Sequence, residues 1–200
     1  MFNKKRFRGL FLNCETVTHD YFERLCAKNN IDQDLIRSAV LIPIIQEEHG
    51  MKILLTHRSS RLEDHASQIS FPGGRIDNGD ITPQDTAIRE TYEEIGINKE
   101  FIEVLGNLDV YATATGFRII PIVGLIKDNF NLKVNPREVD SIFYLPYDYL
   151  MDKKNHKKNE GTYTKQSKSY KYEYNVIPYQ NHYIWGATAG MLINLYQLLK

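Results

Sequence analysis

Three glutamates lie close together in the segment RETYEE at residues 89–94. Residues three and four apart are neighbours on a helix, so Glu90, Glu93 and Glu94 would project from one region of its surface. Like charges at this spacing repel one another and destabilise the helix. A hard divalent cation, which takes oxygen ligands, would offset that repulsion. The segment therefore predicts a metal site, and the alternative is an acidic helix face in contact with water.

A pair of glycines upstream of these carboxylates in the sequence allows a tight loop. The backbone at Gly73 and Gly74 can approach a phosphate closely because neither residue has a side chain. Between the glycines and the glutamates, Asp80, Thr82 and Asp85 can cap the start of a helix. Metal ions that bridge phosphate oxygens and polarise a water would cleave a substrate with two linked phosphates. The whole segment therefore indicates diphosphate hydrolysis more strongly than the glutamates do by themselves.

Helical periodicity over residues 84–96 places the glutamates on a helix that ends at Gly96. The apolar face that we expect to be buried carries Ala87, Ile88, Tyr92 and Ile95. The carboxylates are expected on roughly the opposite face. Arg89 can hold a neighbouring carboxylate in place through a charge-assisted hydrogen bond.

The remaining elements follow from apolar periodicity and from turn residues. Helices are predicted at 19–29 and 187–199, and a hairpin of two strands at 38–45 and 51–58. Further strands are predicted at 101–112, 117–127, 138–145 and 170–176, with polar loops at 59–72 and 151–162. Strands both before and after a helix, with hairpins among them, favour the α/β (α+β) class with a mixed sheet.

Composition favours one enzyme-sized domain over residues 1–200. Lys plus Arg and Asp plus Glu both number 25, which argues against a nucleic-acid-binding protein. Two cysteines are too few for a disulfide framework, and Cys26 is expected to be a buried thiol. The longest apolar runs are too short to span a bilayer, and the start of the chain does not resemble a signal peptide. A cytoplasmic location without membrane association is the resulting expectation.

The segment 73–97 resembles the Nudix box, G-x5-E-x7-R-E-U-x-E-E-x-G-U, in which U is aliphatic. The matching positions are Gly74, Arg89, Glu90, Glu93, Glu94, Gly96 and Ile97. Asp80 occupies the place of the first Glu, one extra residue separates it from Arg89, and Thr91 replaces an aliphatic residue. The resemblance implies a Nudix-like α-β-α sandwich, with 38–200 as the core and 1–37 as an N-terminal helical extension.

A narrower resemblance, to the coenzyme A pyrophosphatase branch of Nudix enzymes, precedes the box. That branch carries L-L-T-x-R-S-x3-R-x3-G-x3-F-P-G-G, and residues 54–74 read LLTHRSSRLEDHASQISFPGG. Glu63 stands at the place of the second Arg, and Ser67 at the place of the first Gly. Segments 137–150 and 184–194 also resemble the branch, so the likeness extends from about residue 38 to the end of the sequence.

The resemblance implies cleavage of coenzyme A to 3',5'-ADP and 4'-phosphopantetheine with Mg²⁺ or Mn²⁺. It implies Glu90 and Glu94 as metal ligands, Glu93 as a further ligand or base, and Arg89 as the residue that orients them. Expected substrate-binding residues are Arg58, Arg61, Gly73 and Gly74; Arg58 can instead be a partner of a box carboxylate. The alternatives are a Nudix hydrolase of ADP-ribose, a dinucleotide or a nucleoside triphosphate, and a catalytically silent binding module. A homodimer is compatible with the sequence.

Overall fold

The structure, a computed structural model, describes residues 19–200 apart from 33, 49 and 166–167. The expectation about a signal peptide, and the first half of the expected extension 1–37, lie outside the described residues. Helix α2 (His19–Lys28) is the helix expected at 19–29, and it buries Cys26 against Phe22 and the central sheet. Within the described residues, every helix is too short or too polar to cross a membrane.

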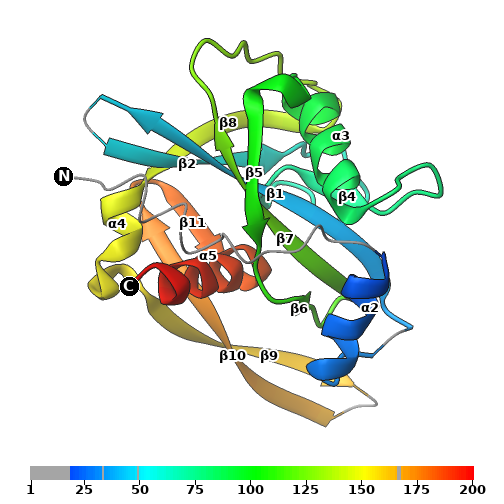
Figure 1. The fold of residues 1–200 in the computed structure, drawn as a ribbon. Helices are drawn as coiled ribbons and strands as arrows, with labels where there is room; N and C mark the ends of the chain where they lie inside the picture. The colour runs from blue at the N-terminus through cyan, green and yellow to red at the C-terminus, as the bar shows by residue number, and fades with distance from the viewer. Residues whose placement is uncertain (1–18, 33, 49, 166–167) are drawn as a thin grey trace.

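A mixed sheet forms the centre of the molecule (Figure 1), as the sequence predicts. Its main strands are β1 (Ile36–Glu47), β2 (Gly50–Arg58), β5 (Ile102–Asn107), β7 (Phe117–Ile126) and β8 (Val139–Pro146). Short strands β3 (Ile69–Ser70), β4 (Gly73–Arg75) and β6 (Tyr111–Ala112) pair at its margins. β1 and β7 are parallel and the other pairs are antiparallel, including the predicted hairpin of β1 and β2. The single strand expected at 101–112 is divided into β5 and β6.

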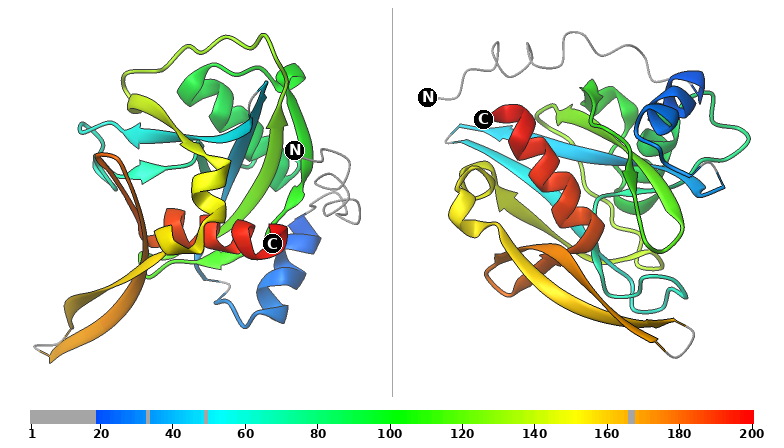
Figure 2. Two further views of the ribbon diagram at one scale, coloured as in Figure 1. Left: turned by 90° about the vertical axis from the view of Figure 1, so that its left-hand side faces the viewer. Right: turned by 90° about the horizontal axis from the view of Figure 1, so that it is seen from below.

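Helices cover both faces of this sheet, which gives the predicted α-β-α layers (Figure 2). β1 has eight consecutive buried residues because its two faces are both covered. One face packs on α2 and on α3 (Pro83–Ile95), through residues such as Phe22, Ala87 and Ile95. The other face packs on α5 (Gly186–Leu199), through Leu192 and Leu195, and on α4 (Tyr147–Met151).

A second, three-stranded antiparallel sheet lies beside α5 and projects from the body of the molecule (Figure 2). It consists of β9 (Lys157–Lys165), β10 (Lys168–Tyr179) and β11 (His182–Trp185). The polar loop expected at 151–162 is therefore wrong: the 3-10 turn η2 (Lys153–Asn155) and most of β9 occupy it. β9 pairs along its length with β10 through backbone hydrogen bonds, so its polar side chains gave no apolar alternation to read.

Helix α3 begins and ends where its capping residues predict. Thr82 and Asp85 form a reciprocal capping box, and Pro83 opens the first turn. Gly96 closes the helix in the left-handed conformation, with φ of 77°, and its N–H donates to Tyr92 O. The expected buried face is wrong at Tyr92, whose side chain is 55% exposed. The face in contact with the sheet instead includes Thr91 and Glu94, so the buried stripe is rotated about the helix axis away from Tyr92.

Thr91 explains how a polar residue occupies the aliphatic position of the box. Its side chain is fully buried, and its hydroxyl donates to Ala87 O at 2.6 Å. A threonine that bonds to the carbonyl one turn back satisfies its own hydroxyl inside the helix. Its methyl group therefore faces the core at no cost in unpaired polar atoms.

Candidate functional site

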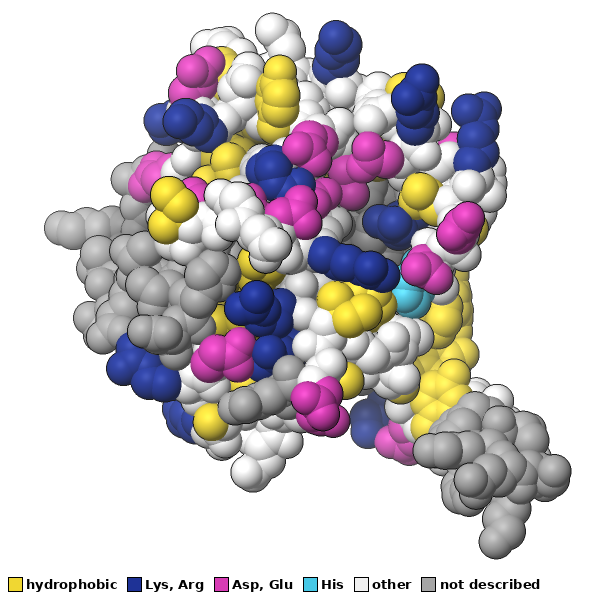
Figure 3. Space-filling model, turned by 90° about the vertical axis from the view of Figure 1, so that its right-hand side faces the viewer, with side chains coloured by type: hydrophobic (Ala, Val, Ile, Leu, Met, Phe, Trp, Pro, Cys, Tyr) yellow, Lys and Arg dark blue, Asp and Glu magenta, His cyan; other side chains and the backbone are white. Residues whose placement is uncertain are grey.

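Three carboxylates meet where the middle of α3 faces the start of β8. One oxygen from each of Glu90, Glu94 and Glu138 lies within 4.8 Å of the other two. The space-filling view shows acidic side chains gathered on this face around a basic residue (Figure 3). Carboxylate oxygens are the ligands that Mg²⁺ and Mn²⁺ prefer, so this cluster has the chemistry of a divalent metal site.

Glu94 is the most deeply buried of the three, with a side chain that is 3% exposed. Burial raises the pKa of its carboxyl to about 8, while Arg58 and the Gly73 backbone oppose the rise. The nearest cation is Arg58, whose Nη1 lies 3.8 Å from Glu94 Oε1. Glu94 Oε2 and Arg58 Nε are both buried without a hydrogen-bond partner among the described residues. Buried polar atoms are rarely left unpaired, so this pair of atoms is suited to a bound ion or phosphate.

Glu90 lies against Gly74, which the structure places in the short strand β4 and not in the expected tight loop. A Cβ on Gly74 would meet Glu90 Oε1 at 2.4 Å, so only glycine leaves room for the carboxylate in its present position. A Cβ on Gly73 would meet Ala39 O at 2.5 Å. Both glycines lie in β4, which pairs with β1, so their observed contacts are with protein. Burial raises the pKa of Glu90, and Arg89 opposes that rise.

Arg89 connects the box to the loop that precedes α3. Its Nε and Nη2 donate to both oxygens of Asp80, at 3.1 and 2.9 Å. Its Nη1 donates to Glu90 at 2.8 Å and to Glu93 at 3.1 Å. Arg89 therefore bonds to two box glutamates, and its role in orienting them stays a prediction. The hydrogen bonds from Arg89 are the main reason that the pKa of Asp80 falls to about 2.

The Asp80 carboxylate thus accepts hydrogen bonds from Arg89 and from the Thr86 hydroxyl, the latter at 2.8 Å. The extra residue between Asp80 and Arg89 lengthens the connection, and the shorter aspartate still reaches the guanidinium. Asp80 lies outside the three-carboxylate cluster of the described residues. The two departures from the box pattern therefore occur together at one ion pair.

Glu93, an expected ligand or base, is not one of the three clustered carboxylates in the described part of the chain. Its side chain is 46% exposed and pairs with Arg89. Among the described residues, the cluster takes its third carboxylate from Glu138 instead. The box pattern spans only 73–97, so sequence reading missed Glu138, forty-four residues beyond Glu94 in the printed sequence. The available signal was an acidic residue at the first position of the strand predicted at 138–145.

The segment 59–72 begins next to the cluster. Ser59 is buried, and its N–H donates to the Glu138 carbonyl at 2.8 Å, which fixes the start of the segment beside the third carboxylate. Arg61 and Glu63 are exposed. Ser67 has φ of 60°, the left-handed conformation for which the related motif supplies glycine. The backbone at this position is therefore the one that glycine favours, although the residue is serine.

Comparisons with known proteins identify the family to which this chain is similar. The family model described as NUDIX domain matches residues 35–166. Nudix hydrolase 3 of Caenorhabditis elegans is 36% identical over 218 aligned residues, which cover all of this chain and 87% of the relative. Nudix hydrolase NudL of Photorhabdus laumondii is 37% identical, with 82% of this chain and 84% of the relative covered.

Two further matches differ in what they support. Nudix hydrolase 15, mitochondrial, of Arabidopsis thaliana is 33% identical over 78% of this chain, and the alignment spans 56% of the relative's length. The solved structure of a MutT/nudix family protein from Enterococcus faecalis aligns with all of this chain and 75% of its own, with a TM-score of 0.55 and 12% identity. That likeness concerns the fold alone. The matched domain and the sequence relatives show that this chain belongs to the Nudix hydrolase family.

Proposed function

We propose that this protein hydrolyses the diphosphate bond of a nucleoside diphosphate derivative, with coenzyme A as the preferred substrate. The observation that carries the proposal is the cluster of Glu90, Glu94 and Glu138, whose oxygens lie within 4.8 Å of one another. Three carboxylates at this distance repel one another unless a cation or protons lie between them. Arg89 contacts only one of the three, and Arg58 lies 3.8 Å from another.

The residues present fit a divalent ion such as Mg²⁺ or Mn²⁺. All three candidate ligands offer oxygen, and Glu94 Oε2 is buried without a partner in the described part of the chain. Glu90, Glu94 and Glu138 would hold the ion, and Glu93 is retained as a further ligand or base at the exposed edge. A bound ion of this kind neutralises phosphate charge and lowers the pKa of a bound water.

The chain's own residues would then position the substrate and the ligands. Arg89 holds Glu90 through a 2.8 Å hydrogen bond, and the Asp80 carboxylate holds the other side of the guanidinium by accepting from Nη2. Arg58 has an unpaired, buried Nε beside Glu94, where a phosphate oxygen could accept from it. Arg61 is exposed in the segment that follows, and it is proposed to contact an outer phosphate of the substrate.

Support for coenzyme A comes from the sequence of residues 54–74, which resembles the motif of that branch. In the structure this segment borders the cluster: Arg58 contacts Glu94, and Ser59 bonds to the backbone of Glu138. The serine at residue 67 keeps the left-handed conformation that the motif's glycine would take. Glu63 replaces a basic residue, and Arg61, two residues earlier, is proposed to supply the missing positive charge.

The test is a product assay with the purified protein and Mg²⁺ or Mn²⁺. Coenzyme A, ADP-ribose, NADH and nucleoside triphosphates would be compared by initial rate, with products identified by mass. Release of 3',5'-ADP and 4'-phosphopantetheine at the highest kcat/KM is the expected result. Preferred cleavage of another compound would retain the metal chemistry and reject coenzyme A. Metal binding without any cleavage would favour the silent binding module.

The role of Arg61 has its own measurement. Arg61→Ala should raise the KM for coenzyme A while kcat changes little, because the residue is proposed to bind the substrate and not the reacting centre. Lys171→Ala, an exposed cation on the distant strand β10, is the control. An unchanged KM in Arg61→Ala would remove Arg61 from the substrate site.

A further inference from the structure

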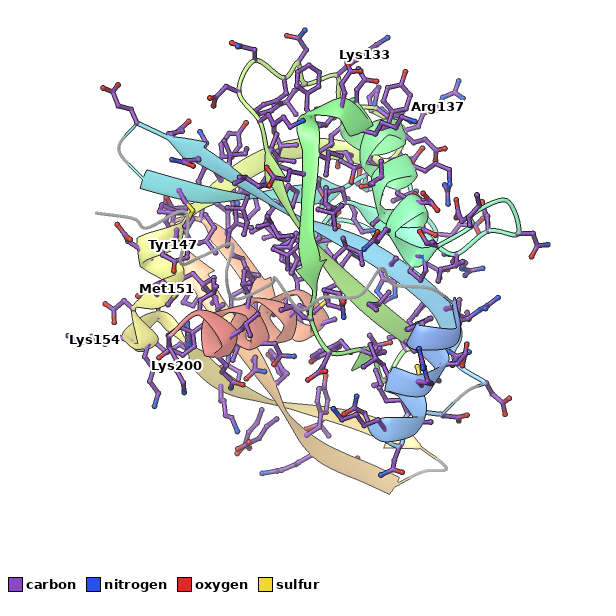
Figure 4. The ribbon with its side chains drawn as sticks, viewed as in Figure 1. Lys133, Arg137, Tyr147, Met151, Lys154 and Lys200 are labelled. Atoms are coloured by element: carbon purple, nitrogen blue, oxygen red, sulfur yellow. The ribbon has the colours of Figure 1, made fainter. Side chains whose placement is uncertain are left out.

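The segment before β8 is fastened to the C-terminal end of α3. The N–H of Lys133 donates to Ile95 O at 2.9 Å, and the N–H of Asn135 donates to Glu94 O at 2.8 Å. Figure 4 labels Lys133 and Arg137 in this segment, where it passes over the end of α3. The last carbonyls of a helix lack partners within the helix, so these two bonds complete α3 and dock the segment on it.

Asn135 uses its remaining polar groups on the residues that lead into β8. Its Nδ2 donates to Glu138 Oε1 at 2.9 Å, and its Oδ1 accepts from the Arg137 N–H at 3.1 Å. Its carbonyl accepts from the N–H groups of Glu138 and Val139, at 3.1 and 2.9 Å. One residue therefore bonds to the backbone of Glu94 and to both the backbone and the carboxylate of Glu138.

We propose that Asn135 is a positioning residue that sets the Glu138 carboxylate opposite Glu94 and Glu90. This inference rests on the proposed function, in which these three glutamates hold a divalent ion. A hydrogen bond to Oε1 fixes the rotation of the carboxylate and leaves Oε2 for another ligand. The Asn135 amide is neutral, so it can orient the Glu138 carboxylate without neutralising its negative charge, as a lysine or arginine would. Partners of this kind strongly affect metal affinity although they never touch the metal.

Two substitutions distinguish the hydrogen bond to Glu138 from the hydrogen bond that holds the turn at Arg137. In Asn135→Ser, the hydroxyl can still accept from the Arg137 N–H, but the amide N–H that donates to Glu138 Oε1 is lost. Asn135→Ala removes both bonds. Calorimetric titration with Mn²⁺ should show affinity weakened about tenfold in both variants. The thermal midpoint should fall further in Asn135→Ala than in Asn135→Ser. Wild-type Mn²⁺ affinity in Asn135→Ser would overturn the inference.

A double-mutant cycle shows whether the effect passes through Glu138. Glu138→Gln should weaken Mn²⁺ binding at least as much as Asn135→Ser does, and the double variant should be no weaker than Glu138→Gln by itself. Additive losses would mean that Asn135 acts elsewhere, which would also overturn the inference. Unchanged affinity in Glu138→Gln would instead reject the proposed ligand set, so the two failures are distinguishable.

Asn159 provides a matched control. Its Nδ2 also donates to a side-chain oxygen, that of Tyr183, but it lies in the hairpin of β9 and β10, away from the cluster. Asn159→Ser should leave Mn²⁺ affinity unchanged. A loss equal to that of Asn135→Ser would show that the measurement responds to general destabilisation, and the inference would fall.

Discussion

The α3 face and the β9–β10 hairpin both pair basic residues with glutamates, but the two regions differ in how deeply these charges are buried. On the hairpin, Lys158 pairs with Glu173 at 2.8 Å, and both side chains are more than 60% exposed. On the α3 face, Glu94 is buried and has a pKa of about 8, and Arg89 contacts three carboxylates at 3.1 Å or less. Water screens the hairpin pair, whereas burial makes each charge on the α3 face depend on its neighbours.

The difference has a structural origin. β9 is an edge strand of the three-stranded sheet, so its side chains meet solvent and its pairing rests on backbone hydrogen bonds to β10. On α3, the side chains of Glu90 and Glu94 are 16% and 3% exposed. Glu90 lies against Gly74 of β4, and both glutamates lie next to Glu138 at the start of β8. Whether a carboxylate in this protein is suited to bind an ion therefore depends on how deeply it is buried, and not on its presence in the sequence alone.

The largest effect is expected from Glu94→Gln, which keeps the shape of the side chain and removes its charge. Turnover should fall about a thousandfold because a metal ligand in the reacting site is lost. Glu173→Gln on the hairpin should leave turnover unchanged and alter stability by less than about 0.5 kcal/mol. Initial rates with Mn²⁺ and thermal unfolding measure both. Near-normal turnover in Glu94→Gln would remove the contrast between the two regions.

A smaller but specific effect is expected from Gly74→Ala. The added Cβ would lie 2.4 Å from the present position of Glu90 Oε1, so the carboxylate must move. Mn²⁺ affinity should fall by about tenfold to a hundredfold, with little loss of stability because the displaced atoms end a flexible side chain. Gly79→Ala, where a Cβ meets nothing within 4 Å, is the control. Equal Mn²⁺ affinity in the two variants would show that the glycine serves another purpose.

Metal affinity should also depend on pH in the direction set by Glu94. Its pKa in the metal-free fold is about 8, so below that pH the ion must displace a proton. Mn²⁺ affinity should rise by up to about tenfold per pH unit as pH approaches 8, and then level off. Calorimetry at pH 6.5 in buffers of different ionisation enthalpy should detect proton release. No release, with strong binding, would contradict the raised pKa.

The sign for stability is opposite. A carboxyl whose folded pKa lies above its ordinary value stays protonated in the fold while the unfolded chain ionises. The metal-free protein should therefore lose stability as pH rises from about 4.5 towards 8, a loss that Glu94→Gln should abolish. Chemical unfolding in the presence of a chelator at a series of pH values measures this.

The smallest effect is expected at Ser67, which has φ of 60°. Ser67→Gly should stabilise the fold by about 1 kcal/mol because glycine adopts this conformation without the steric cost of a Cβ. Ala66→Gly next to it should be neutral or destabilising, since the structure records no left-handed backbone there. Thermal unfolding compares the two. Equal shifts would mean that the Ser67 backbone carries no strain.

Sequence reading by itself predicted the parts of the site that are local along the chain. The capping residues Thr82 and Asp85, the end of α3 at Gly96 and the contact of Arg89 with Glu93 four residues later depend on helical spacing. The mixed sheet and its covering helices followed from apolar periodicity, which reports burial directly. The family was inferred from the resemblance of residues 73–97 to the Nudix box.

Tertiary structure decided what lies across space from that segment. It selected Glu138 over Glu93 as the third carboxylate of the cluster, because the segment before β8 lies beside α3 only in the folded chain. It exposed Tyr92 and buried Glu94, since the rotation of α3 on the sheet depends on packing. It also formed β9 from a polar segment through backbone bonds to β10, which no side-chain pattern reveals. Spacing fixes neighbours along one helix, and only packing brings separate elements of the chain to a common site.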